Sequence, residues 1–499
     1  MSPQWMQTFS QMTPEVAVLV TIVWVMLSDL FLGKNPRSIW SQALLGLTAA
    51  GLAAFSLVSV DTQALHPSIQ GVFVSTPLTS LLKSAVLLMA ALAVAFAHRG
   101  FNESRQHAGE FYTLILFSTL GALLCISSQD LLLFFVSFEL MSLPLYMLCA
   151  FRRYNSASAE AGLKYFINGA LSSAFLLYGI SWVYGSVSST HLPTIALRYS
   201  QLDQIPQGLM VGCLLMLAGL AFKVSAAPFH NWAPDVYSGA PTTVSTFLAS
   251  APKLAMVGFI LRLFWAYLNR AGAFFQLSSD WVWIFAILSV VSMFVGNLSA
   301  LPQTDVRKIL AYSGIAQIGY IFLGLSACSL HNPNPHQALA AVIFYSIVYG
   351  ISNLGAWAVL AFATRGQERV DLASLRGLHQ RNPLLAACLA LCVMSLAGVP
   401  PLSGFMGKFY MFRSVYESKM QFLVVLGILN SVISLYYYFK VLKAAYFVEA
   451  EEGGPASLAL HIIQRLGIHL CLWSNLVLGL WPGFMQVVDG VTGTLTQGS

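Results

Sequence analysis

The stretch Leu217–Pro241, reading LAGLAFKVSAAPFHNWAPDVYSGAP, decides the fold. It begins like a membrane-spanning helix, but Lys223 lies inside the apolar run and Pro228 follows five residues later. An ammonium group at the centre of a bilayer costs about 2.5–3.5 kcal/mol on insertion scales. A proline inside a helix removes a backbone donor and frees a carbonyl that hydrocarbon cannot satisfy. Both costs fall where the segment faces a hydrated, protein-lined interior, so the stretch predicts a broken helix at an ion-transport site.

The composition predicts an all-α polytopic membrane protein. Charged residues make up 9% of the 499 residues and hydrophobic residues 57%, whereas a soluble domain has about 25% charged residues. Apolar windows of about 20 residues recur along the chain, and we expect about 14 transmembrane helices. The first, near Val16–Leu32, has neither a basic region before it nor a small-residue cleavage site after it, so it reads as a true span and not as a cleaved signal peptide. The net charge of +6 comes from the loops and does not indicate nucleic acid.

Basic residues alternate between successive loops and predict the orientation. The even-numbered loops carry little beyond Arg198, Arg262, Arg270, Arg413 and Lys419. By the positive-inside rule the odd-numbered loops are cytoplasmic, which places both termini on the external side. The odd-numbered loops carry Lys34, Arg37, Arg99, Arg105, Arg152, Arg153, Arg307, Lys308, Arg365, Arg369, Arg376, Arg381, Lys440, Lys443 and Arg465.

A second interrupted segment predicts an internal repeat. Ser395–Phe412, SLAGVPPLSGFMGKFYMF, again combines proline and glycine with a lysine, Lys408. It lies five spans after the first, and an odd number of spans makes the two units inverted relative to each other. The expected division is three N-terminal helices in 1–110, five-helix units in 111–268 and 281–448, and a loop with the last helix in 449–499.

Five ionisable residues in or beside apolar runs are the candidates for chemistry. Glu139 is the lone acid in LLLFFVSFELMSLPLYML, and a buried carboxylate becomes protonated unless a cation pairs with it. Lys253 follows Pro252 inside the eighth span, and Lys164 opens the sixth. With Lys223 and Lys408, five such unpaired groups would cost on the order of 15 kcal/mol, which matches or exceeds a typical folding stability. Their retention favours proton handling over a purely structural bundle.

Other residues leave two interpretations open. Lys164 fits either a proton-transfer role or an interfacial lysine that reaches the headgroups, and His230 fits a relay or a hydrogen-bonding core residue. Lys83 reads as a snorkelling lysine, and the seven cysteines read as core residues without a metal-ligand set. The tyrosines that could bridge water chains or simply pack are Tyr312, Tyr320, Tyr345 and Tyr438, and the cluster that reads as a structural charge group is Asp305, Arg307 and Lys308.

Three stretches resemble the antiporter-like subunits of respiratory complex I, an NADH–quinone oxidoreductase. They are FKVSAAPFHNWAPDVYSGAPTTVSTFLASAPK, TDVRKILAYSGIAQIGY and PPLSGFMGKFYMF. The resemblance covers essentially the whole chain and is strongest to the N-type branch. It implies fourteen helices in two inverted five-helix units, each with a half-channel around a broken helix.

The resemblance also implies roles for individual residues. Glu139 matches the acidic residue of the fifth helix, and Lys223 matches its partner on the broken seventh helix, with His230 just beyond the break. Lys164 matches the lysine of the sixth helix, and Lys253 matches the lysine that links the half-channels. Lys408 matches the lysine near the second break, where the M-type branch is expected to carry a glutamate.

The function implied is proton translocation coupled to quinone reduction elsewhere in a large complex. No cofactor is expected in this chain, whereas NADH, FMN, iron–sulfur clusters and quinone belong to partner subunits. M-type and K-type membrane subunits are the expected neighbours, in the inner membrane of a bacterium. Alternatives are a subunit of a cation/proton antiporter, of a membrane-bound hydrogenase or of a ferredoxin-fed photosynthetic complex, and a scaffold that transports nothing.

Overall fold

A computed structural model describes residues 3–31, 35–60, 69, 71–98, 107–201, 206–267, 274–328, 332–363, 370–449 and 460–497. Several of the basic loop residues used for the orientation lie outside these ranges. They are Lys34, Arg99, Arg105, Arg270, Arg365 and Arg369.

The described chain is helical, as the composition predicts. Its helices are α1 (Pro3–Gln11), α2 (Thr13–Phe31), α3 (Pro36–Ser56), α4 (Pro77–Ala97), α5 (Ala108–Ser127), α6 (Leu131–Cys149), α7 (Ser156–Val187), α8 (Leu192–Ser200), α9 (Gln207–Val224), α10 (Trp232–Gly239), α11 (Thr242–Leu248), α12 (Ala251–Leu261), η1 (Arg262–Tyr267), α13 (Phe274–Ala300), α14 (Val306–Ala327), α15 (Pro335–Ala363), η2 (Leu372–Leu375), α16 (Leu378–Arg381), α17 (Pro383–Ala397), α18 (Ser403–Glu417), α19 (Gln421–Tyr446), α20 (Ile462–Leu480) and α21 (Gly483–Gln497).

Thirteen helical stretches of the described chain are long and apolar enough to cross a membrane. The predicted span centred on Leu396 is divided into α17 and α18, so the expectation of about fourteen spans in an all-α membrane protein is confirmed. An even number of crossings returns the chain to the side on which it began. The sequence did not indicate α21, which follows the last span and packs against α15 and α4.

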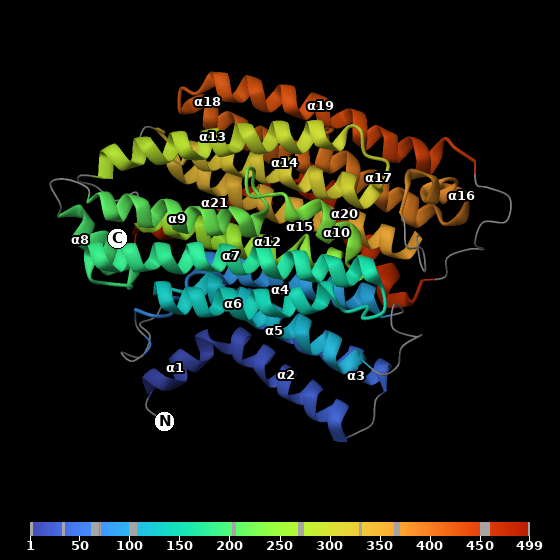
Figure 1. Cartoon of the computed structure of the whole chain (residues 1–499), viewed down its shortest axis with the longest axis horizontal. Coiled ribbons are helices and arrows are strands. Elements are labelled where there is room, and N and C mark those ends of the chain that lie inside the picture. The colour runs from blue at the N-terminus through green and yellow to red at the C-terminus, as the bar shows by residue number, and fades with distance from the viewer. Residues whose placement is uncertain are drawn as a thin grey trace.

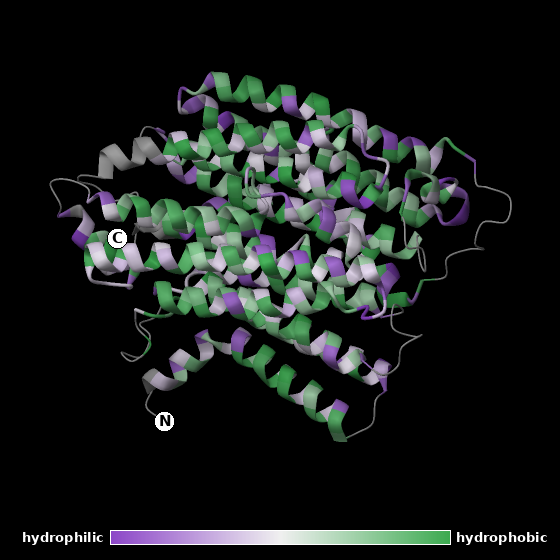
Figure 2. Ribbon diagram, in the orientation of Figure 1, coloured by the Kyte–Doolittle hydropathy of each residue, from purple (hydrophilic) through white to green (hydrophobic). Residues whose placement is uncertain are grey.

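The most apolar helices occupy the centre of the bundle. α15, α14, α4 and the α11–α12 pair are buried along nearly their whole length, whereas α2, α3, α7 and α13 are largely exposed. Figure 1 shows the helices running across the bundle, with α2 and α3 at one edge and α18 and α19 at the other. Figure 2 shows hydrophobic residues covering the helices and hydrophilic ones gathered toward their ends, the pattern of a chain whose outer surface meets lipid or other membrane proteins.

The same local arrangement occurs in both halves of the chain. Asp130 caps α6 by accepting a hydrogen bond from the backbone of Leu132 (2.8 Å), and Asp305 caps α14 through the backbone of Arg307 (2.8 Å). Asp130 forms a β-bridge to His191, and Asp305 forms one to Asp371.

A pair of close helix contacts repeats with the same sequence offset. A Cβ on Gly121 of α5 would lie 2.3 Å from the backbone nitrogen of Met141, and one on Gly296 of α13 would lie 2.5 Å from that of Ala316. Only glycine permits an approach this close. Equal numbers of residues separate Gly121 from Gly296, Met141 from Ala316, and the two capping aspartates from each other.

Candidate functional site

The first break lies where the sequence predicts it, between α9 and α10. α9 ends at Val224, and Ser225 adopts a left-handed backbone conformation (φ 61°). The carbonyls that a continuous helix would satisfy find other donors: Ala226 N donates to Ala221 O (2.8 Å), and the Trp232 indole donates to Phe222 O (3.0 Å). The break therefore exists without leaving these buried carbonyls unpaired, as a membrane interior requires.

Lys223 is buried in the last turn of α9, with 3% of its surface exposed. Its ammonium donates to Ser142 Oγ on α6 at 2.8 Å. Three rings surround the same nitrogen, those of Phe138, Tyr146 and Tyr165, at 5.1–5.4 Å from their centroids. Cation–π contacts of this kind stabilise a desolvated ammonium by about 2 kcal/mol. Ser142 is the only hydrogen-bond partner of this ammonium within the described chain, so a small displacement of α6 would alter that hydrogen bond.

Glu139 and Lys223 form no direct ion pair in this conformation. Glu139 accepts a short hydrogen bond from Ser173 Oγ on α7, and it is only partly buried. Ser142, one turn further along α6, accepts the hydrogen bond from the Lys223 ammonium instead. Ser142 lies on the inward face of the helix, while Glu139 lies toward the exposed face. Glu139 remains near enough to interact electrostatically with Lys223.

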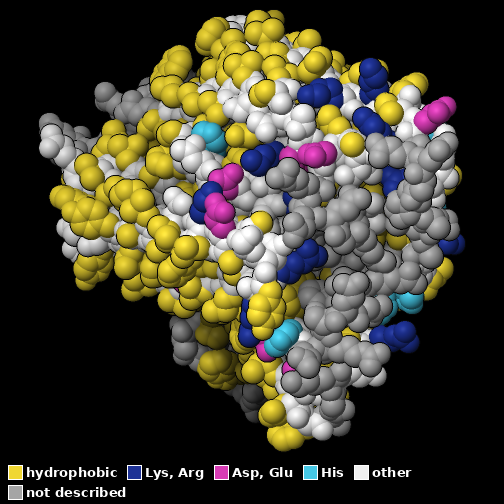
Figure 3. Space-filling model, turned by 45° about the vertical axis from the view of Figure 1, so that its right-hand side comes forward, with side chains coloured by type: hydrophobic (Ala, Val, Ile, Leu, Met, Phe, Trp, Pro, Cys, Tyr) yellow, Lys and Arg dark blue, Asp and Glu magenta, His cyan; other side chains and the backbone are white. Residues whose placement is uncertain are grey.

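Lys164 lies at the surface of the bundle, so the expectation that it is one of the buried charged residues is wrong. Its side chain is 42% exposed, and its ammonium forms ion pairs of 2.7 Å with Glu160 and with Asp235 of α10. Lys308 of α14 approaches the same aspartate at 3.8 Å. Figure 3 shows a face of the molecule on which acidic and basic side chains adjoin next to an area of hydrophobic side chains. Asp235 thus links the two halves of the chain at the accessible side of the first break.

His230 lies in the break itself and is half-buried. No hydrogen bond joins its ring to Lys223 or Lys253 among the residues that the structure describes. Its neighbours Pro228 and Asn231 are exposed, while Ala227 donates its backbone N–H to Ser292 Oγ of α13 at 3.0 Å. The histidine therefore lies half-buried in the break without a described hydrogen bond to either lysine, which leaves both of its interpretations open.

Lys253 occupies the centre of the molecule, where the eighth span is itself interrupted between α11 and α12. It is 5% exposed, and its ammonium lies 5.4 Å from the centroid of Tyr237. A Cβ on Gly314 of α14 would come within 3.2 Å of Lys253 Nζ and 3.1 Å of the Tyr349 hydroxyl. The number of residues from Glu139 to Gly314 equals the number between the two capping aspartates. At the position where the first half has the Glu139 carboxylate, the second half therefore has a glycine, which leaves room for Lys253.

A hydrogen-bonded group centred on Gln317 fills the space between Lys253 and the second break. The Gln317 amide donates to Leu396 O (2.9 Å) and to the Tyr438 hydroxyl (3.1 Å), and its carbonyl accepts from Tyr345. Tyr438 also contacts Ser313 Oγ through a short hydrogen bond. Gln317 and Ser313 flank Gly314 on α14, and Asn353 of α15 donates to the Tyr349 hydroxyl (3.2 Å) beside Lys253. The polar groups thus extend from the central lysine toward α17.

Lys408 lies at the second break and is 3% exposed. Its ammonium donates to Leu396 O (3.1 Å) and Ala397 O (3.2 Å), the final carbonyls of α17, and lies 4.3 Å from the centroid of Tyr320. Gly398 follows with φ 87°, and a Cβ there would meet the lysine side chain at 3.1 Å. Because Leu396 O accepts from both Gln317 and Lys408, one carbonyl connects the lysine to the Gln317 group.

Replacing Gln317 with leucine should interrupt proton passage between Lys253 and Lys408. The change removes the described acceptor of the Tyr345 hydroxyl, at a cost of about 1–3 kcal/mol for a buried group left unsatisfied, whereas Leu396 O still accepts from Lys408. We expect the assembly to persist and quinone-coupled proton translocation to fall, measured in sealed vesicles. Gln464→Leu is the matched control, since Gln464 is equally buried and hydrogen-bonded but lies on α20. Equal loss in both variants would contradict a specific role for Gln317.

Sequence reasoning missed Gln317, Ser142 and Asp235. Ser142 and Gln317 stand at the same offset as the two capping aspartates, so aligning the halves would have shown two polar side chains at one position of the repeat. Of the four tyrosines considered, Tyr345 and Tyr438 contact Gln317, and Tyr320 lies under Lys408. Tyr312 instead lies near Asp235.

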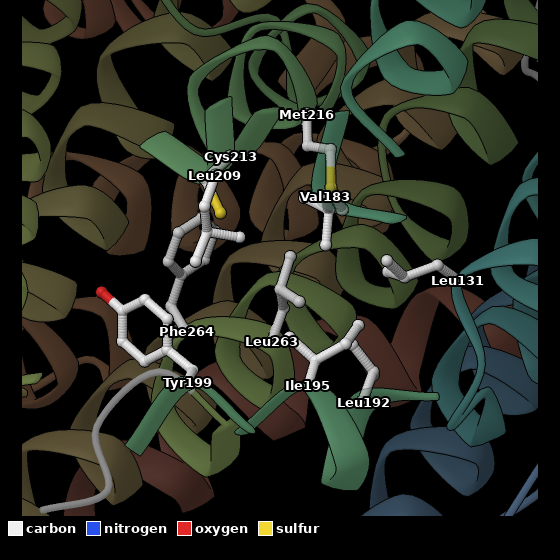
Figure 4. Close-up of a pocket in the computed structure, with 10 residues that line it drawn as sticks. All are labelled: Leu131, Val183, Leu192, Ile195, Tyr199, Leu209, Cys213, Met216, Leu263 and Phe264. Carbon is white, nitrogen blue, oxygen red and sulfur yellow. The ribbon is translucent and has the colours of Figure 1, made fainter. Parts of the chain in front are cut away.

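The chain also contains an apolar pocket beside α8. Figure 4 shows carbon and sulfur atoms facing its interior, with the hydroxyl of Tyr199 directed away. Its walls come from α6, α7, α8, α9 and η1: Leu131, Val183, Leu192, Ile195, Tyr199, Leu209, Cys213, Met216, Leu263 and Phe264. No carboxylate, lysine or histidine is among the residues that line the pocket.

The described ranges contain no group of three or more His, Cys, Asp or Glu that could hold a metal. Cys388 and Cys392 are buried free thiols with sulfurs 3.9 Å apart, packed in the core as their sequence context predicts.

Comparison with known proteins gives consistent matches along the chain. Residues 128–434 match the family described as NADH:quinone oxidoreductase/Mrp antiporter, transmembrane. The NADH-quinone oxidoreductase subunit N 2 of Acidobacterium capsulatum is 40% identical, over 95% of this chain and 96% of its own. The F(420)H(2) dehydrogenase subunit N of Methanosarcina mazei is 35% identical, over 96% of this chain and 97% of its own.

A solved structure of respiratory complex I from Thermus thermophilus, with bound aureothin, contains a chain of the same fold. The TM-score is 0.78 with 31% identity, and the match covers 94% of this chain and 97% of the other.

Proposed function

The chain belongs to the NADH:quinone oxidoreductase/Mrp antiporter transmembrane family, and we propose that three of its buried lysines carry protons through the membrane arm of an NADH-quinone oxidoreductase. The chain is the N-type subunit of such a translocase, as its relatives are. The observation that carries the proposal is the series Lys223, Lys253 and Lys408, each buried and each placed at an interrupted helix.

The chemistry follows from how these lysines are held. An ammonium buried with few hydrogen bonds loses its proton more readily than one in water, and a nearby carboxylate restores its affinity. Movement that brings Glu139 and Lys223 together or apart therefore changes the proton affinity of Lys223. Released protons pass to Lys253, through the hydroxyl and amide groups around Gln317, and on to Lys408. Redox energy from other subunits supplies the movement.

The accessible residues supply the entrance. Asp235, Lys164 and Lys308 form ion pairs at the surface beside the first break, and His230 is half-buried in the break itself. A histidine ring can accept a proton at one nitrogen and donate one from the other, which suits proton uptake from bulk water. Lys164 then acts as a charge partner of Asp235 at the entrance and not as a relay in the interior.

The proposed division of the chain follows the two breaks. Residues 111–268 and 281–448 form the inverted units, each with a broken helix, and residues 1–110 and 449–499 flank them. The capping aspartates and close glycine contacts at equal offsets support this division. Both termini then lie on the external side of a bacterial inner membrane, as the positions of the basic residues indicate.

Neighbouring membrane subunits are the proposed partners, with M-type and K-type subunits adjacent. The exposed apolar face of α6 and α7 supports a membrane-protein contact there: Val136, Leu143, Met147, Leu163 and Ile167 lie at its surface beside the partly exposed Glu139. NADH, FMN, iron–sulfur clusters and quinone are held by other subunits. A F(420)H(2) dehydrogenase among the relatives makes another electron donor the second candidate.

Purification of the native assembly tests this function. We expect subunits with flavin and iron–sulfur clusters to co-purify, and NADH-driven quinone reduction to acidify or alkalinise sealed vesicles. An assembly without those subunits that exchanges sodium for protons would instead make the chain part of a cation/proton antiporter. A flavoprotein that oxidises another donor would retain the translocase and change only its substrate.

A further inference from the structure

A buried ion pair lies in the three N-terminal helices, away from both breaks. Glu15 in the first turn of α2 and Lys83 of α4 approach to 2.7 Å, with exposed fractions of 4% and 1%. The expectation that Lys83 snorkels to the headgroups is therefore wrong: α4 begins only six residues earlier, yet the side chain points into the bundle and meets an acid from another helix. The proton path described above uses neither residue.

The pair is poorly satisfied for a structural contact. Apart from the ion pair itself, no described group hydrogen-bonds to the Lys83 ammonium or to either Glu15 oxygen, although an ammonium has three donors and a carboxylate about four acceptor sites. The Phe73 ring lies 4.7 Å from Lys83 Nζ. Buried ion pairs stabilise a fold only when further hydrogen bonds satisfy the remaining donors and acceptors. Stability alone therefore does not explain a buried pair that lacks those hydrogen bonds.

A second cation connects the pair to the central helix. Arg262 follows α12, is 4% exposed, and donates to Ile126 O through a short hydrogen bond. It interacts electrostatically with Lys83. Between the two, a Cβ on Gly258 of α12 would meet Leu82 of α4 at 3.0 Å, so the helices are in close contact beside Lys83. Lys253 begins this same helix, one residue after its proline.

Arg262 places a permanent positive charge near the Glu15–Lys83 pair. Arginine stays protonated under all ordinary conditions, so the charge of Arg262 stays the same whichever of Lys83 and Glu15 holds the proton. Glu15 is the nearest acceptor. The three groups together keep one net positive charge when Lys83 and Glu15 are both ionised or both neutral, so a proton can pass between them without a change in total charge.

Polar side chains continue from the pair toward the end of the bundle. Thr8, Gln11 and Glu15 recur at spacings of three and four along α1 and the first turn of α2, and all three are buried. The neighbours on the other faces, Met6, Phe9 and Val16, are exposed. A single buried polar stripe thus lies on helices that otherwise present apolar side chains, and it leads from Glu15 to the end of the bundle where α2 begins and α12 ends.

We propose that Glu15 and Lys83, assisted by Arg262, form a proton-exchange site at the end of the bundle where α2 begins. The Lys83 ammonium gives a proton to the Glu15 carboxylate across 2.7 Å, the acid gives it to water along Gln11 and Thr8, and the amine takes up a proton from the interior. One proton enters and one leaves in each cycle. The inference rests on the proposed function, because the protons that arrive are those carried by the interior lysines.

Lys83→Arg tests the site most sharply. A guanidinium keeps the ion pair with Glu15 but does not release its proton. We expect the complex to assemble, and quinone-driven proton translocation in sealed vesicles to fall to the level of a Lys223→Met variant prepared alongside. A structural pair predicts wild-type translocation in Lys83→Arg.

The double variant Glu15→Gln/Lys83→Gln provides a second route if the arginine does not fit. It removes both charges together, so no unpaired ion is left buried. A proton-exchange site predicts assembly with translocation lowered to the Lys223→Met level, and a structural role predicts full translocation. The control is Arg413→Gln/Glu417→Gln, which removes an exposed pair on α18 and should change nothing.

The outcomes separate the two proposals. Loss in Lys223→Met with wild-type translocation in both Lys83 variants overturns this inference and keeps the proposed function. Loss in the Lys83 variants with wild-type translocation in Lys223→Met contradicts the interior lysine path, and this inference fails with it because its protons come from that path. If neither Lys83 variant assembles, the pair is a structural requirement and the inference is overturned.

Discussion

Replacing Lys223 with methionine should stop proton transfer through this subunit while leaving the chain folded. Methionine fills nearly the same volume and suits the rings of Phe138, Tyr146 and Tyr165. It also removes an ammonium whose burial costs about 3 kcal/mol, so assembly should be preserved. A group that transfers protons typically contributes about 10²–10⁴-fold, and we expect a loss of that order in the rate carried by this path, measured as proton translocation driven by quinone reduction in sealed vesicles.

Lys440→Met is the control for this substitution. Lys440 donates to two backbone carbonyls, those of Leu301 and Gln303, but unlike Lys223 it is only partly buried and lies near the end of α19. Its replacement should leave proton translocation near the wild-type rate. Normal translocation in Lys223→Met, with normal assembly, would show that the chain carries no protons past the first break.

Replacing Lys253 with methionine should separate the two halves of the path. Lys253 is the buried cation beside Gly314 and Tyr349, between the first break and the Gln317 group. Without it, protons that reach Lys223 have no described titratable lysine to receive them before Lys408. We again expect a loss of about 10²–10⁴-fold in this path, with quinone reduction slowed to the same degree if the complex is tightly coupled.

Gly314→Ala gives this second substitution its control. The added methyl would lie 3.2 Å from Lys253 Nζ, so it disturbs the lysine without removing it. Translocation in Gly314→Ala should fall between the wild-type and Lys253→Met values. If Lys253→Met equals wild type, the central lysine does not connect the two units.

The positions of the breaks could be predicted from the sequence because their causes are local. A lysine and a proline within one apolar run are incompatible with a continuous helix in hydrocarbon, and this holds for both Lys223–Pro228 and Pro400–Lys408. The structure places Lys223, Lys253 and Lys408 in the interior, as that argument requires.

Side-chain partners could not be predicted, because they come from helices distant in the sequence. Lys83 pairs with Glu15, and Lys164 pairs with Asp235. In both pairs the acid lies on a different helix from the lysine. Glu139 and Lys223 were expected to pair because both are ionisable and apolar surroundings favour pairing. The rotation of α6 decides otherwise: it turns Ser142 inward and directs Glu139 to Ser173 on α7. Helix rotation depends on packing and leaves no local signal.

Lys253→Arg in the assembled complex tests the central claim most directly. The substitution keeps a positive charge at the centre of the chain but removes a proton that can be released. The measured quantity is the number of protons translocated for each quinone reduced, together with the rate of quinone reduction. If buried lysines pass protons along the chain, the ratio or the coupled rate falls sharply although the complex is intact. An intact Lys253→Arg complex with the wild-type ratio and the wild-type rate would show that Lys253 supplies only a charge, and the account would be contradicted.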